Sequence, residues 1–162
     1  MSQKAEEIFP DNCKIDDIKV LAGGIEFTTR LKTACLANIL MGSATRILMR
    51  LASFKADGFR RLEAQIKAID WELYLPHQAR PDIRVTTQKS RLYHSTAIAD
   101  RIRPMIHDRL VLKEYPGYHD AAKPPGTIPQ ALMVRGKNDR FELSLDISGI
   151  PLYKRGIKEN VV

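Results

Sequence analysis

Apolar residues in the first part of the chain form two short runs and then change their spacing. The runs Ile18–Leu21 and Ile25–Phe27 flank a pair of glycines, a pattern typical of a β-hairpin or a bent strand. From Leu31 to Gly42 apolar residues recur at helical spacing, which predicts a helix. The nearly continuous apolar stretch over 47–54 predicts a strand that is buried on both faces.

The next segment predicts a second helix and a third strand. Asp57 is a suitable N-cap for a helix whose apolar stripe runs over 59–69. Trp71, Leu73 and Leu75 then follow at spacing two, and Pro76 closes the run. The order strand, helix, strand, helix, strand favours an α+β fold with a ferredoxin-like part.

Beyond a seam at Pro76–Pro81 the pattern predicts a strand, a long helix, a loop, a hairpin and a last short strand. In chain order these are Ile83–Val85, Leu92–Leu110 with a bend or interruption at Pro104, Tyr115–Thr127, Leu132–Val134 paired with Phe141–Ile147, and Leu152-Tyr153.

The charge of the chain narrows the classes of partner. Its net charge is +7, with cations concentrated between Arg80 and Lys113 and again after Tyr153. Such a surplus favours a polyanion, either nucleic acid or an anionic membrane surface. The apolar stretches are too short to span a bilayer and the first residues do not form a signal peptide, so we expect a cytoplasmic protein without a membrane partner.

The residue types that carry catalysis are present but not grouped. The four histidines have no partners at metal-ligand spacing, and Cys13 and Cys35 form no CxxC pair, so we expect no metal. No glycine-rich phosphate loop occurs. The segment KPPG over 123–126 differs from the Asn-Pro-Pro-aromatic run of amino methyltransferases, because a lysine cannot accept a hydrogen bond. Asp146 could be functional, but we favour a role in the turn at Ser148-Gly149.

Basic and aromatic residues are interleaved in the predicted long helix. By the helical period, Arg91, His94, Ile98 and Arg101 lie within about one and a half turns of one face. Cations hold a phosphate backbone, and an aromatic or guanidinium plane can stack on an unpaired base. The alternative is an ordinary solvated helix surface, and charge alone does not separate the two.

The segment 144–156, SLDISGIPLYKRG, closely resembles the end of the THUMP region in bacterial 23S rRNA guanine-N2 methyltransferases. In those enzymes a Leu-Asp-x-Ser-Gly segment precedes a leucine, an aromatic residue or histidine, one or two basic residues and Arg-Gly. Five shorter upstream segments look similar to the same family: 44–48 (ATRIL), 54–56 (FKA), 69–71 (IDW), 90–94 (SRLYH) and 97–99 (AIA).

The resemblance implies a ferredoxin-like part packed on a THUMP domain, which together grip structured RNA, with rRNA as the expected target. It divides the chain into a partial N-terminal ferredoxin-like element over 1–33, a THUMP region over 34–157 and a tail over 158–162. Within the THUMP region the ferredoxin-like part reaches about residue 78 and the THUMP core covers 79–157. In that family a separate S-adenosylmethionine-dependent domain follows, so we expect a methyltransferase domain in cis or in trans and no cofactor in this chain.

The resemblance and the charge together indicate candidate RNA contacts. Both support Arg91, His94, Lys154 and Arg155; charge alone adds Arg84, Lys89, Arg101 and Lys158. Two other hypotheses remain open. One is a small enzyme that acts through Asp146 and His94, and the other is a protein-interaction or oligomerisation domain with an incidental basic surface.

Overall fold

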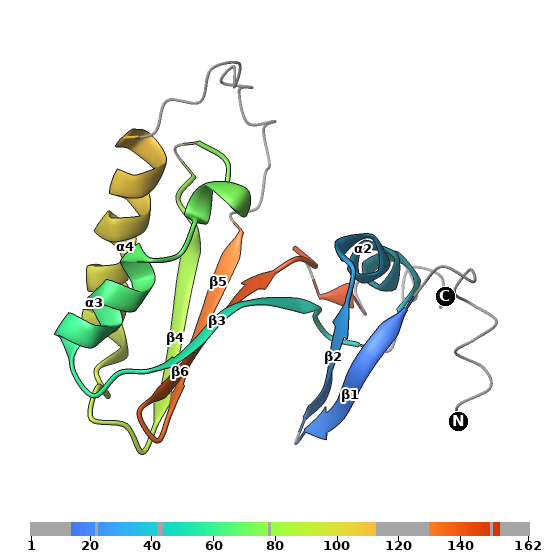
Figure 1. The fold of residues 1–162 in the computed structure, drawn as a ribbon, viewed down its shortest axis with the longest axis horizontal. Helices are drawn as coiled ribbons and strands as arrows, with labels where there is room; N and C mark the ends of the chain where they lie inside the picture. Colours follow the sequence, from blue (N-terminus) through green and yellow to red (C-terminus); the bar gives the residue numbers. More distant parts are fainter. Residues whose placement is uncertain are drawn as a thin grey trace, which may run out of the picture. The chain divides into compact units, whose positions relative to one another are not determined.

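A computed structural model describes residues 14–21, 23–41, 44–77, 79–112, 130–149 and 151–152. The chain divides into two compact units (Figure 1). The first holds the residues up to Ile47 together with those after Gly149, and the second is Leu48–Gly149. The seam expected at Pro76–Pro81 therefore lies inside the second unit, and the boundary falls about 30 residues earlier.

The first unit contains the predicted hairpin and helix. Strand β1 (Ile15–Leu21) pairs antiparallel with β2 (Gly24–Thr29), and helix α2 (Leu31–Leu40) follows. Gly23 has a φ of +90° at the turn, a conformation that suits glycine because it has no Cβ. Both predictions are confirmed, although large apolar side chains of this unit stay exposed, with Val20 at 83%.

The second unit is a four-stranded sheet with helices on one face (Figure 1). The strand order is β3-β6-β5-β4, with ranges Leu48–Lys55, Arg140–Asp146, Ala131–Lys137 and Asp82–Gln88. Strands β4 and β5 run parallel and the other pairs are antiparallel. Helix α3 (Phe59–Lys67) and helix α4 (Ser95–Leu112) contact each other and the sheet. The α+β class is confirmed.

Alternation along β5 and β6 gives the sheet two different faces. Leu132, Val134, Phe141, Leu143 and Leu145 are buried in the core with α3 and α4. The intervening side chains point to the opposite face, which we call the outer face, because successive residues of a strand alternate. On β5 and β6 that face carries mostly charged residues.

The predicted third strand is wrong. Trp71–Leu73 is a 3-10 helix, η1, in which Trp71 is fully buried and its indole N–H donates to the carbonyl of Ile66 at 2.9 Å. Leu75 is also buried, whereas Leu73 between them is 74% exposed. The spacing that buries side chains is four residues, one helical turn, and not two.

Smaller differences concern strand β3 and the ends of the helices. Strand β3 lies at an edge of the sheet and is half-buried, not buried on both faces. The N-cap of α3 is Gly58 and not Asp57, and α4 runs without interruption through Pro104. Leu152 belongs to no strand. The loop expected at 115–127 and Tyr153 lie outside the described residues.

Candidate nucleic-acid interface

Three loops meet at one end of the sheet: the loop after β3, the loop after β4 and the β5–β6 turn. Hydrogen bonds around Asp139 hold them together. The amide of Ala56, after β3, donates to the Asp139 carbonyl at 2.8 Å. The Arg91 amide, after β4, donates to Asp139 Oδ1 at 2.7 Å. In return the Asp139 amide donates to Ser90 Oγ at 3.2 Å. One carboxylate and its peptide groups thus fix the loop after β3 and the loop after β4 against the β5–β6 hairpin.

The hairpin turn itself is tight. Asn138 and Asp139 have φ values of +52° and +61°, the left-handed pair that a two-residue type I′ turn requires. Asparagine and aspartate tolerate this region better than most residues, so the sequence favours the turn. It brings Lys137 and Arg140 directly opposite each other.

Cations line up across the outer face beside this turn. Strand register places Lys55 next to Arg140 and Arg140 next to Lys137. Neighbouring strands are about 4.8 Å apart, so three cationic side chains start within about 10 Å. One row further along, Arg135 stands opposite Glu142.

A hollow of about 500 Å³ lies over these rows. We call this cavity the basic hollow. It is lined by Lys55, Arg135, Lys137, Asn138, Arg140 and Glu142. Glu142 is the one carboxylate, and it already pairs with Arg50 at 3.1 Å. The hollow therefore carries a surplus of positive charge.

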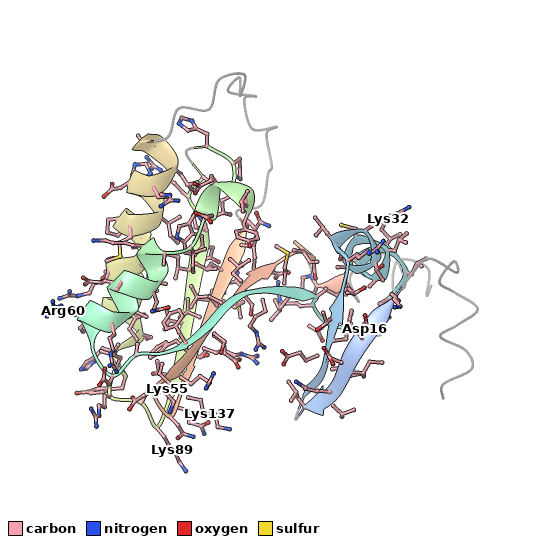
Figure 2. All side chains as sticks on the ribbon, in the orientation of Figure 1. Asp16, Lys32, Lys55, Arg60, Lys89 and Lys137 are labelled. Carbon is pink, nitrogen blue, oxygen red and sulfur yellow. The ribbon has the colours of Figure 1, made fainter. Side chains whose placement is uncertain are left out.

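Most cations of the basic hollow are not neutralised. Among the described residues, Lys55, Arg135 and Lys137 form no ion pair, and Arg140 donates only to Ser53 Oγ at 3.3 Å. Figure 2 shows Lys55, Lys137 and the additional Lys89 at the same end of the second unit. Cations that lie close together repel each other, which raises the free energy of the surface without a ligand. A bound anion would lower that free energy.

The predicted contacts Lys89, Arg91 and His94 all lie in the loop that joins β4 to α4. Because α4 begins only at Ser95, the helical face expected from Arg91 to Arg101 does not exist, and that prediction is wrong. The Arg91 guanidinium lies 3.7 Å from Asp139 and 3.8 Å from Asp57, with its side chain 72% exposed. Arg91 therefore helps to hold the loops and still reaches solvent.

The other predicted contacts are placed differently. Arg101 pairs with Glu63 at 2.6 Å and lies 4.3 Å over the Phe59 ring, which ties α4 to α3. Arg84 pairs with Asp82 at 2.8 Å on the outer face. Neither brings its charge to the basic hollow. The remaining candidates, Lys154, Arg155 and Lys158, lie outside the described residues.

Sequence reasoning did not identify the cations of the basic hollow. Arg135 and Lys137 alternate with the buried Val134 and Gly136, and Arg140 begins the next strand. Cations at alternate positions of one strand, with a further cation at the start of the next strand of a predicted hairpin, place charge on one sheet face. Lys55 becomes adjacent only through long-range pairing, which a local pattern does not contain.

Asp146 has the structural role favoured from the sequence. It is buried, and its Oδ1 accepts the Ser148 amide at 2.9 Å. By strand rise, the end of β6 that carries Asp146 lies about 20 Å along the sheet from the turn. His94 is near the turn end, because Thr87 Oγ1 donates to the neighbouring Tyr93 carbonyl at 3.0 Å. The two residues of the enzyme hypothesis are therefore not brought together.

Metal-ligand clusters and membrane-spanning helices are both missing from the described ranges. No group of three or more His, Cys, Asp or Glu residues is placed to hold a metal ion there. No helix in the described part is long and apolar enough to cross a membrane.

Comparison with known proteins identifies relatives of this chain. The chain is 28% identical over 146 residues to YpsC of Bacillus subtilis, a candidate RNA methyltransferase, covering 90% of this chain and 36% of YpsC. It is 26% identical over 144 residues to the ribosomal RNA large subunit methyltransferase K/L of Syntrophotalea carbinolica, covering 88% of this chain and 20% of that enzyme. This chain is homologous to one part of RNA methyltransferases. No protein-family model matches it.

Solved structures agree on the fold. A possible methylase from Clostridium difficile superposes with a TM-score of 0.72 at 25% identity, covering 96% of this chain and 40% of the other. A predicted N6-adenine-specific DNA methylase from Listeria monocytogenes gives 0.71 at 27% identity, with coverages of 90% and 38%. SMU.472, a candidate methyltransferase crystallised with SAH, gives 0.70 at 26% identity, with coverages of 86% and 37%. The chain spans well under half the length of each of these proteins.

Proposed function

We propose that this chain is a THUMP-type RNA-binding module, with a ferredoxin-like part, that serves an S-adenosylmethionine-dependent RNA methyltransferase. The catalytic domain is contributed in cis or in trans, and the names of the relatives favour rRNA as the target. The main support for this proposal is the basic hollow, where Lys55, Arg135 and Lys137 lie together without ion pairs in the described part of the chain.

The geometry supports binding and not chemistry. The basic hollow holds cations on a rigid sheet, beside a turn fixed by hydrogen bonds from two neighbouring loops. Such an arrangement positions phosphates and gives a steep dependence of affinity on salt. The side chains lining it include neither histidine nor cysteine, and its one carboxylate, Glu142, pairs with Arg50. We therefore assign RNA retention to this surface and methyl transfer to another domain.

The test is fluorescence anisotropy across a salt series, with an rRNA hairpin and a DNA duplex of equal charge. The double variant Arg135→Ala/Lys137→Ala should weaken RNA binding and lower the salt slope by about 2, since each removed cation leaves one phosphate unneutralised. The matched control, Lys67→Ala/Arg103→Ala, removes the same charge from the exposed surfaces of α3 and α4. Equal weakening in both variants would contradict a site in the basic hollow.

The DNA duplex tests whether the chain prefers RNA to DNA. This comparison is needed because one similar structure is described as a DNA methylase. We expect tighter binding to the RNA hairpin at every salt concentration. Equal weak binding to both polyanions would mean only a basic surface.

A second candidate function is protein interaction through the first unit. Ile18, Val20, Ile25 and Ile39 are each more than 60% exposed there, and exposed apolar patches mark interaction surfaces. Sedimentation of the RNA-free chain distinguishes the two functions. Self-association without RNA preference would favour this candidate over the RNA-binding module.

A further inference from the structure

An exposed aromatic pair lies in the loop that carries Lys89 and Arg91. Tyr93 and His94 have ring centroids 4.0 Å apart and an interplanar angle of 40°. His94 therefore lies against part of the Tyr93 ring, and Tyr93 still remains 65% exposed. An exposed aromatic ring next to cationic side chains offers a surface on which a nucleotide base can stack.

The loop holds Tyr93 rigidly at its backbone. Ser90 Oγ donates to the Gln88 carbonyl at 3.2 Å, and Thr87 Oγ1 donates to the Tyr93 carbonyl at 3.0 Å. Leu92 is buried in the core, and the His94 carbonyl accepts the Ile98 amide at the start of α4. A ring presented from a fixed backbone loses little conformational entropy when a ligand stacks on it.

Cations flank the aromatic pair. Lys89 forms no ion pair among the described residues, and it lies at the same end of the unit as Lys55 and Lys137 (Figure 2). Its φ of +50° is costly for a lysine, so the loop holds this residue in a conformation that the isolated chain disfavours. Strained non-glycine residues are concentrated where ligands bind.

We infer that the loop Lys89–His94 binds an unpaired RNA nucleotide, whose base stacks on Tyr93 while Lys89 and Arg91 contact the adjoining phosphates. This inference rests on the proposed function and specifies its ligand as RNA with single-stranded nucleotides. In a duplex the base faces are covered by their neighbours, whereas an unpaired base exposes a face to an aromatic ring. A paired stem offers the loop only its phosphates.

The experiment compares two RNA hairpins with the same stem, each closed by a polyether linker in place of loop nucleotides. One is blunt, and the other has a four-nucleotide 3′ extension that contains 2-aminopurine. Tyr93→Ala should weaken binding of the extended hairpin about five- to a hundred-fold, the range for loss of one stacked base. Binding of the blunt hairpin should change less than about two-fold. Tyr93→Phe should retain wild-type affinity, and the wild-type chain should quench 2-aminopurine fluorescence where Tyr93→Ala does not.

Leu73→Ala is the matched control, because Leu73 is exposed to 74% and Tyr93 to 65%. Leu73 lies in η1, which contacts α4 near Arg109 and not near its first residue. It should affect neither hairpin. Equal affinity of Tyr93→Ala and the wild type for the extended hairpin would overturn the stacking site and leave the proposed function intact. Failure of the wild-type chain to bind either hairpin would overturn the proposed function and the stacking site with it.

Discussion

Gly136 in strand β5 tests whether the hairpin that carries the basic hollow is packed as described. It stands opposite Phe141, and a Cβ added to it would come within 2.7 Å of that ring. The ring is fully buried and stacks on Phe54 at 6.4 Å, so it has little room to withdraw. Gly136→Ala should therefore overpack the core, which costs about 1–3 kcal/mol.

Part of that cost is offset in the unfolded chain. Replacing glycine by alanine reduces the entropy of the unfolded state, which stabilises by about 0.4–1 kcal/mol where the backbone permits. We expect a net destabilisation of about 1–2 kcal/mol, equivalent to a fall in Tm of about 2–8 °C for a chain of this size.

Urea unfolding followed by tryptophan fluorescence measures this effect. Trp71 is the one tryptophan of the chain and is buried in the second unit, so its emission reports on that unit. Gly58→Ala is the control, because a Cβ added there would meet no atom within 4 Å and the φ of Gly58 is extended. Alanine is less favourable than glycine at this N-cap, but it also reduces the entropy of the unfolded chain. These two effects offset each other, so stability should change by less than about 0.5 kcal/mol. A Gly136→Ala chain as stable as the wild type would refute the close approach of Gly136 to Phe141.

Three further predictions concern charge and turns. Lys89→Gly should raise the free energy of unfolding by about 1 kcal/mol, because glycine accepts the positive φ. The same variant should lower the salt slope of RNA binding by about 1. A fall in stability would contradict the claim that the backbone of Lys89 is strained. Asp146→Ala should lower urea stability by about 1–3 kcal/mol, since the buried amide of Ser148 loses its acceptor; an unchanged midpoint would refute the turn role. Arg109→Ala removes two hydrogen bonds to the half-buried Glu72 carboxylate and should lower urea stability by about 1–3 kcal/mol, with a smaller loss in Arg109→Ala/Glu72→Gln; equal losses in the two variants would contradict this role of the pair.

Much of the fold follows from local patterns. The hairpin around Gly23, the helix from Leu31, the helix with Leu62 and Ile66, and the hairpin at Asn138-Asp139 are all found where the sequence predicts them. Each depends on periodicity or turn chemistry within a few residues. Tertiary packing overrides the spacing of apolar residues at Trp71. Burial of its large ring in the core favours a 3-10 turn, η1, over a strand.

The candidate site can be derived from the sequence only in part, for a physical reason. Lys89, Arg91 and His94 share one short loop, so their proximity is visible in the sequence. Lys55 and Arg140 are 85 positions apart and become neighbours through the pairing of β3 with β6. Ion pairing is equally non-local, because the charge of Arg101 is balanced by Glu63 on another helix.

Cross-linking tests the central claim most directly. Ultraviolet irradiation of the chain bound to 4-thiouridine-labelled rRNA hairpin, followed by mass spectrometry of the peptides, maps where the RNA lies. The account predicts cross-links within β5–β6 around Lys137 and in the loop from Lys89 to His94. Cross-links confined to the exposed surfaces of α3 and α4, with none at these two segments, would contradict RNA binding at the basic hollow.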